Sequence, residues 1–229
     1  MKKRLKVNGV IVLIAFLSIA VFPDFFLRYN RFSSLDTAAQ IIGIALILLG
    51  QLFRVSARGF KSENSFNGRA LIIGGPYTLV RNPMYLGIFL IGLGMVLVLF
   101  RWQVACVFLL IFTLRYVLLI FNEEKKLSRI FPQEYPEYCS EVPRLFPSLK
   151  MLLKKDIREY LPLKSPWIKK EIGAILAVLL ITLAVDFWLC IKKGDLSVYL
   201  HGLVWMAGVI ILFIFLSGYL WCRKVSLQD

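Results

Sequence analysis

The stretch MYLGIFLIGLGMVLVLFRWQVACVFLLIFTLRYVLLIF, residues 84–121, consists of two long apolar runs separated by Arg101. Each run has about the 17–25 residues that a helix needs to cross a bilayer. Because a single residue joins them, we expect a tight antiparallel helical hairpin. Gly87, Gly92 and Gly94 in the first run permit another helix or a ligand to approach closely. The stretch therefore predicts membrane-embedded helices.

The composition of the whole chain agrees with this prediction. Of the 229 residues, 59% are hydrophobic and only 18% are charged, and the mean hydropathy is +0.72. A water-soluble domain could not bury so much apolar surface. We therefore predict an all-α integral membrane protein with six transmembrane helices near residues 7–22, 35–53, 84–100, 102–121, 172–191 and 198–221.

The basic residues are distributed unequally between the loops of this six-helix topology. Twenty-two of the 28 lysines and arginines fall on one side of the membrane, five fall on the other, and Arg115 lies within the fourth span. Cytoplasmic loops of membrane proteins are enriched in Lys and Arg. We therefore expect cytoplasmic N- and C-termini, and we interpret the net charge of +14 as topology and attraction to membrane lipids rather than nucleic-acid binding.

The cysteines and the single histidine do not form a metal-binding or disulfide pattern. Cys106, Cys139, Cys190 and Cys222 include no CxxC pair, and His201 is far from all but one of them in sequence. A zinc site or a disulfide framework requires closely spaced ligands or paired cysteines. The sequence therefore predicts neither, and it leaves the oligomeric state open.

The loop before the hairpin, residues 74–87, reads GGPYTLVRNPMYLG and is rich in turn formers. Asn-Pro at 82–83 suits the N-cap and first position of a helix. Tyr77, Arg81 and Tyr85 would then gather around a helix N-terminus, whose free amides and dipole favour an anion. The alternative is structural, with the tyrosines at the membrane interface and the arginine anchoring the helix end.

A second unusual segment, FNEEKKLSRIFPQEYPEYCSEVPRLFP, follows the hairpin at residues 121–147. Its helical spacing extends beyond the bilayer until Pro132, so Glu123 and Glu124 lie within the helix at headgroup depth. Carboxylates at that depth need solvent or partners. The expected partners are a cationic ligand, Lys126 or Arg129, and the alternative is a solvated helix end.

Together the two segments resemble a known family. G-P-Y-x-x-V-R-N-P-M-Y-L-G, followed after one more span by E-E-x-x-L and F-P-x-E-Y-x-x-Y-x-x-x-V-P-R-L-x-P, is similar to the isoprenylcysteine carboxyl methyltransferase family and its phospholipid methyltransferase relatives. The resemblance covers roughly residues 69–147. It implies a membrane methyltransferase that uses S-adenosyl-L-methionine, bound at the cytoplasmic end of the helices, and it implies no metal.

The same resemblance assigns the cofactor-binding residues. Glu123 corresponds to the cofactor glutamate of the family, and Glu124 is its neighbour in the pair. A carboxylate suits the ammonium group of the cofactor, helix amides suit its carboxylate, and aromatic faces suit a sulfonium. The assigned residues are Arg69, Ala70, Leu71, Ile72, Tyr77, Arg81, Asn82, Pro83, Met84, Tyr85, Glu123 and Glu124.

Two departures from the family pattern bear on the acceptor. Asn82 replaces the usual histidine, and Leu119 stands where prenylcysteine methyltransferases place an arginine that holds the substrate carboxylate. Arg115, one turn earlier on roughly the same helix face, is our tentative substrate contact. We therefore expect a lipid, an isoprenoid or another apolar acceptor rather than a prenylated protein.

Two other functions remain as alternatives. Steroid 5α-reductases share a similar motif but use NADPH, and they usually carry Asn and Glu at the positions of Met84 and Ile88. The chain could also be a non-enzymatic membrane scaffold with a decayed pocket. Binding of labelled S-adenosyl-L-methionine or of NADPH would distinguish the three.

We divide the chain into three parts. Residues 1–149 form the four-span methyltransferase core with its cytoplasmic motifs. Residues 150–170 form a basic amphipathic linker, with Leu152, Leu153, Leu161 and Trp167 among its basic residues, which lies on the inner leaflet or is solvated. Residues 171–229 form an additional two-span hairpin.

Overall fold

The computed structural model describes residues 21–27, 34–65, 70–147 and 157–193, together with 200, 203–204, 207–208, 210–215 and 218. Within these ranges the chain is helical, and its one extended pairing is a single bridge between Leu27 and Phe100. Arg69, the predicted span 7–22 except for its last two residues, and much of the span 198–221 lie outside the described residues.

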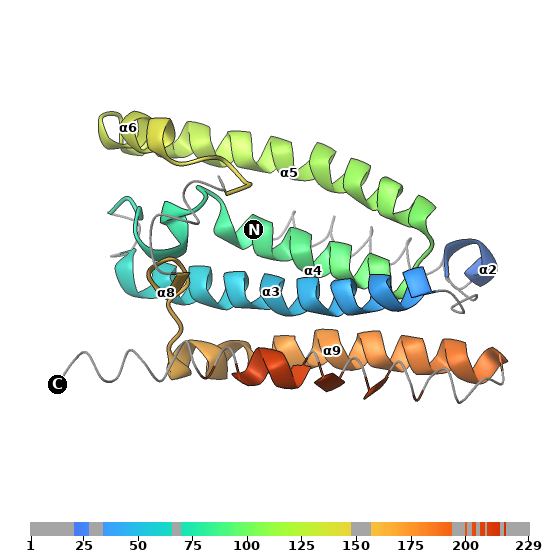
Figure 1. Cartoon of the computed structure of the whole chain (residues 1–229). Helices are drawn as coiled ribbons and strands as arrows, with labels where there is room; N and C mark the ends of the chain where they lie inside the picture. The colour runs from blue at the N-terminus through green and yellow to red at the C-terminus, as the bar shows by residue number, and fades with distance from the viewer. Residues whose placement is uncertain are drawn as a thin grey trace.

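Four long helices lie side by side (Figure 1). α4 lies between α3 and α5, and α9 lies along the other side of α3. Short elements gather at the two ends, with α2 at one end and η2, α6 and α8 at the other. The elements are α2 (Pro23–Phe26), α3 (Ser34–Asn64), η2 (Gly75–Thr78), α4 (Pro83–Leu99), α5 (Trp102–Ile130), α6 (Glu134–Glu141), α8 (Ile157–Tyr160) and α9 (Ser165–Lys193).

The predicted hairpin is present. α4 and α5 are joined at Arg101, and α5 continues to Ile130 and ends before Pro132, as its spacing predicted. α3 and α9 also extend beyond the predicted spans 35–53 and 172–191. Two described helices, α3 and α5, are long and apolar enough to cross a membrane, and α4 is a shorter apolar helix. The total of six spans and the side of the termini stay predictions.

Glycines allow α3 and α4 to pack with their backbones nearly in contact. A Cβ atom on Gly50 would lie 2.7 Å from the Gly87 carbonyl oxygen, and one on Gly87 would lie 2.8 Å from the Gly50 carbonyl oxygen. Gly43 and Gly94 repeat this reciprocal contact seven residues away along both helices. The close approach predicted for Gly87 and Gly94 is therefore made with α3.

The end of the predicted linker packs against α3. Leu161 and Trp167 are buried, and the Trp167 ring lies over Gly59, where a Cβ atom would collide with it. Ser56 Oγ donates a hydrogen bond to the Pro162 carbonyl oxygen at 2.8 Å. These two apolar side chains therefore cover the end of α3, while the placement of residues 150–170 at the inner leaflet stays a prediction.

Ion pairs fix α9 to the same end of α3. Glu171 is buried and accepts hydrogen bonds from Arg54 at 3.2 Å and from Arg58 at 2.5 Å. A turn of α3 beyond Arg58, Glu63 accepts hydrogen bonds from Lys164 at 2.6 Å and from the Trp167 indole nitrogen at 2.7 Å. Charged and polar contacts thus connect α9 and the residues before it to the end of α3. Farther along α3, close packing of the two backbones connects it to α4.

Candidate functional site

A cavity of about 390 Å³ lies where the start of α4, the end of α5 and α6 meet. Both sequence motifs contribute to its wall. The lining residues are Lys61, Ser65, Ala70, Leu71, Ile72, Tyr77, Arg81, Asn82, Pro83, Met84, Tyr85, Ile88, Glu123, Glu124, Lys126, Leu127, Ile130, Phe131, Tyr135 and Tyr138. They include every residue assigned to the cofactor except Arg69, which the structure does not describe.

The Asn-Pro pair begins α4 as predicted, but Asn82 does not cap it with its side chain. Its amide nitrogen instead donates to the Arg144 carbonyl oxygen at 3.1 Å. Its own carbonyl oxygen accepts the Tyr85 N–H at 3.1 Å, and Pro83 has no N–H to offer. Among the described backbone hydrogen bonds of this first turn, the Met84 amide has no acceptor.

Tyr85 and Glu123 join the two motifs inside the cavity. The Tyr85 hydroxyl donates to Glu123 Oε2 at 2.7 Å, although 38 residues separate them in sequence. The Tyr85 ring also meets the Tyr116 ring edge-on, with centroids 5.3 Å apart. Glu123 is exposed, so its carboxylate can accept a further donor from a ligand in the cavity.

Glu124 lies in different surroundings, although it is the next residue along α5. It is only 9% exposed. Arg144 donates to both of its oxygens, from Nε at 3.1 Å and from Nη2 at 2.9 Å, and Arg81 Nη1 lies 3.4 Å from Oε1. Of the three partners that the sequence predicts, Lys126 and Arg129 are exposed and neither forms an ion pair with the two glutamates in the described structure, while a cationic ligand stays a prediction.

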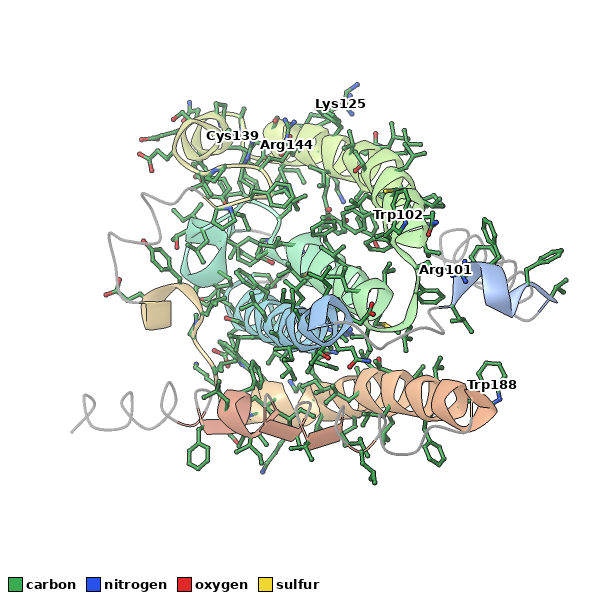
Figure 2. All side chains as sticks on the ribbon, turned by 45° about the vertical axis from the view of Figure 1, so that its right-hand side comes forward. Arg101, Trp102, Lys125, Cys139, Arg144 and Trp188 are labelled. Atoms are coloured by element: carbon green, nitrogen blue, oxygen red, sulfur yellow. The ribbon has the colours of Figure 1, made fainter. Side chains whose placement is uncertain are left out.

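Figure 2 shows how α6 and the segment after it cover this end of α5. Arg144 and Cys139 lie at the junction of the two helices, while Lys125 projects away from the bundle. Arg81 Nη1 donates to Cys139 Sγ at 2.7 Å, and Arg81 N donates to the Pro143 carbonyl oxygen at 2.9 Å. The loop before α4 is therefore attached to α6 and to the segment that follows it.

Three tyrosines in the cavity wall are held in their neutral form. Burial raises the pKa of Tyr77, and the Glu123 carboxylate raises it further. Burial is also the main reason why the pKa of Tyr135 and the pKa of Tyr138 are raised. The Tyr138 hydroxyl donates to the Tyr77 carbonyl oxygen at 2.6 Å. These phenols are therefore hydrogen-bond donors and aromatic surfaces at neutral pH, not general bases.

Arg81 remains charged in this wall. Burial alone would lower its pKa, but the Glu124 carboxylate opposes this effect, and the pKa is raised overall. Its Nε atom is buried and has no hydrogen-bond partner in the described structure. Leaving a buried donor unpaired costs free energy, so a ligand acceptor that bonds to this nitrogen would gain binding free energy.

Arg115 does not line the cavity. It is partly exposed on α5, eight residues before Glu123, which is about 12 Å along a helix. Its role as a substrate contact stays a prediction. The sequence assigns no role to Arg144, and the only signal for it is its place in the V-P-R-L-x-P motif. Within the described ranges, no three His, Cys, Asp or Glu side chains gather closely enough to hold a metal ion.

The chain is similar to two curated proteins. It is 31% identical over 111 residues to the "Cobalt-zinc-cadmium resistance protein CzcN" of Cupriavidus metallidurans, a match that covers 48% of this chain and 49% of that protein. It is also 31% identical over 114 residues to the "Nickel-cobalt-cadmium resistance protein NccN" of Alcaligenes xylosoxydans xylosoxydans, with the same coverage of 48% and 49%. The match thus spans about half the length of each relative.

No solved structure matches the chain significantly. A family model described as "Phospholipid methyltransferase" matches residues 38–134, which run from the first turns of α3 to the first residue of α6 and carry nearly all of the cavity lining. This match confirms the resemblance that the two motifs predicted. Over residues 38–134 the chain is therefore similar to the phospholipid methyltransferase family.

Proposed function

We propose that the chain is a multi-pass membrane methyltransferase that binds S-adenosyl-L-methionine in this cavity and methylates a lipid, an isoprenoid or another apolar acceptor. The observation that carries the proposal is that both motifs line one cavity, inside which the Tyr85 hydroxyl and Glu123 form a 2.7 Å hydrogen bond. The family match supports methyl transfer as the reaction class.

The residues in the cavity fit the chemical groups of this cofactor. Glu123 offers a carboxylate to the ammonium group, and Arg81 offers a charged guanidinium to the carboxylate. Tyr85 and Phe131 present aromatic surfaces to a sulfonium, which attracts the face of a ring. The cavity volume of about 390 Å³ lies in the range of small-molecule sites.

Methyl transfer mainly requires that the methyl donor and the acceptor are aligned. When bound, the cofactor supplies an activated methyl group on its sulfonium. The protein side chains then need to hold the two reactants in line and exclude water, and such alignment can supply roughly 7–11 kcal/mol of the barrier. The neutral tyrosines and Asn82 provide no strong base, which suits an acceptor that arrives as an anion or a neutral nucleophile.

The position of the cavity relative to the apolar surface supports an apolar acceptor. Trp102 is exposed at the start of α5, and the distance from there to Phe121 is about 30 Å along the helix, one hydrocarbon thickness. The cavity would then lie at the headgroup level. Leu110, Leu114 and Leu118 form an exposed apolar surface on the same helix, where a membrane-dissolved acceptor would collect.

We further propose that the cavity faces the cytoplasm. Lys61, Lys126 and Arg129 lie at this end of α3 and α5, while the opposite end of the α4–α5 hairpin carries Arg101. Because most of the lysines and arginines in the chain fall on the cavity side, the positive-inside rule favours this orientation.

Cofactor binding tests the proposal directly. Purified wild-type protein in detergent should bind labelled S-adenosyl-L-methionine, and Glu123→Gln should weaken that binding about 10–100-fold, because a charged hydrogen bond is worth about 1.5–3 kcal/mol. Glu141→Gln is the matched control, since Glu141 is exposed at the end of α6 and does not line the cavity. Binding of NADPH without S-adenosyl-L-methionine would refute the proposal, and binding of neither would favour a scaffold.

The acceptor can be found with the same material. Incubation of the protein with labelled cofactor and a total lipid extract should transfer label to an extractable apolar product. Glu123→Gln should reduce this transfer, and Glu141→Gln should leave it unchanged. Label that stays in the aqueous phase would contradict an apolar acceptor.

A further inference from the structure

The two adjacent glutamates face in different directions and meet different partners. Successive residues on a helix do not share a face. Glu123 is exposed in the cavity and is bonded by the Tyr85 hydroxyl, whereas Glu124 is buried between two guanidinium groups. Only Glu123 therefore has a carboxylate free to meet a ligand, although the sequence assigned both to the cofactor.

Glu124 lies where three separate segments meet. It belongs to α5, Arg81 precedes α4, and Arg144 belongs to residues 142–147, which follow α6 and which we call the strap. Two further contacts attach the strap to the start of α4, from Arg81 N to the Pro143 carbonyl oxygen and from the Asn82 amide to the Arg144 carbonyl oxygen. The Arg144 guanidinium also lies over the Phe121 ring, 4.5 Å from its centroid.

The Glu124 carboxylate partly neutralises the two guanidinium groups of Arg81 and Arg144. Two guanidiniums share one carboxylate, so removal of the Glu124 charge leaves two like charges close together. Arg144 is 44% exposed and can turn toward solvent, but Arg81 is 13% exposed and has little room to do so. A buried charge without its partner is strongly unfavourable. Removal of the Glu124 charge should therefore destabilise mainly Arg81 and the backbone next to it.

We propose that Glu124 and Arg144 are positioning residues, which clamp the strap and the start of α4 against α5 and thereby fix the cavity wall that carries Tyr135, Tyr138 and Tyr85. This inference rests on the proposed function only in calling the cavity a cofactor site. The clamp itself is a property of the fold. Glu123 binds the ligand and Glu124 holds the wall in place.

Hydrogen exchange on the full chain in detergent tests the clamp without any ligand. The Arg81 amide is protected by the Pro143 carbonyl oxygen, so a peptide that covers residues 79–86 reports directly on the strap. In Glu124→Gln this peptide should exchange at least about tenfold faster, as expected when local opening becomes easier by about 1.4 kcal/mol. A peptide from α9 should be unchanged.

Three further variants separate the clamp from cofactor contacts. Arg144→Lys should also accelerate exchange at residues 79–86, because lysine cannot reproduce the two-pronged contact with Glu124. Glu124→Asp should restore part of the protection and part of the S-adenosyl-L-methionine affinity that Glu124→Gln loses. Glu123→Gln should lower that affinity and leave the exchange as in wild type.

The inference is overturned if Glu124→Gln leaves exchange at residues 79–86 unchanged, or if Glu123→Gln accelerates it equally. If the α9 peptide also loses protection in Glu124→Gln, the protein has opened globally, and Arg144→Lys decides, since unchanged exchange in that variant refutes the clamp. A wild-type protein that binds no S-adenosyl-L-methionine would overturn the proposed function, while the exchange results would still decide the clamp.

Discussion

Replacement of Gly50 by alanine tests the backbone contact between α3 and α4. The new Cβ atom would lie 2.7 Å from the Gly87 carbonyl oxygen and 2.8 Å from both Ile91 Cγ1 and Ile91 N, about 0.7 Å closer than ordinary contact. Two of these three atoms belong to the backbone of α4, so the helix itself must move. Overpacking of this kind costs about 1–3 kcal/mol.

Helix propensity offsets part of that cost, because alanine is favoured over glycine by about 1 kcal/mol within a helix. We therefore expect Gly50→Ala to be less stable by up to about 2 kcal/mol. For a chain of this size, that change lowers Tm by up to about 8 °C. Gly87 lies two residues after Tyr85, so displacement of α4 should also weaken S-adenosyl-L-methionine binding.

Thermal unfolding of the detergent-solubilised protein, followed by circular dichroism, measures this effect. Gly173→Ala is the control, because a Cβ atom on Gly173 would meet no atom within 4 Å on α9. That substitution should leave Tm unchanged or raise it. If Gly50→Ala raises Tm as much as Gly173→Ala does, the two helices are not in backbone contact.

Three further predictions concern other parts of the chain. Glu171→Gln should lower Tm by about 1–3 °C in the same assay, because it removes the shared partner of Arg54 and Arg58, of which Arg58 is largely exposed. An unchanged Tm would show that these two ion pairs do not contribute to stability. Arg115→Ala should reduce turnover with a given acceptor more than it reduces cofactor affinity, since Arg115 lies outside the cavity, and a silent substitution would exclude it from the substrate site. The pKa of Tyr138 is raised in the folded protein, so the contribution of this residue to stability is present below about pH 10 and is lost as the pH rises further. Tyr138→Phe should therefore make Tm fall less steeply at alkaline pH. A pH profile of Tm identical to that of the wild type would contradict the raised pKa.

Local chemistry made several features predictable from the sequence. Asn-Pro at 82–83 marks the start of α4 because proline needs no donor there, and Pro132 ends α5 because it cannot continue the helix. The hairpin follows from two apolar runs joined by one residue. Each of these predictions depends on neighbours within a few positions, which a sequence displays directly.

Contacts between distant segments were predicted less well. Lys126 and Arg129 seemed suitable partners for the glutamates because they are near in sequence, but both are exposed, and Arg144 reaches Glu124 from 20 residues away. Trp167 was identified only as an apolar residue in a basic segment, because hydropathy reports that a side chain avoids water. It does not report whether lipid or Gly59 covers that side chain.

The location of the cavity follows from an asymmetry in how α4 packs. Toward α3 it presents glycines, so the two backbones nearly touch along the seam. Toward α5 it presents the Phe89 ring, whose centroid lies 4.8 Å from that of Phe112 on α5. Phe112 is stacked on Tyr116 of the same helix at 4.1 Å, and Gly92 of α4 faces the Phe108 ring. Aromatic rings between α4 and α5 keep these two helices farther apart than α3 and α4, which pack through glycines. The two helices of the hairpin are therefore separated up to the level of Tyr85. The gap at their ends needs a cover, and the clamped strap with its tyrosine-bearing α6 supplies one.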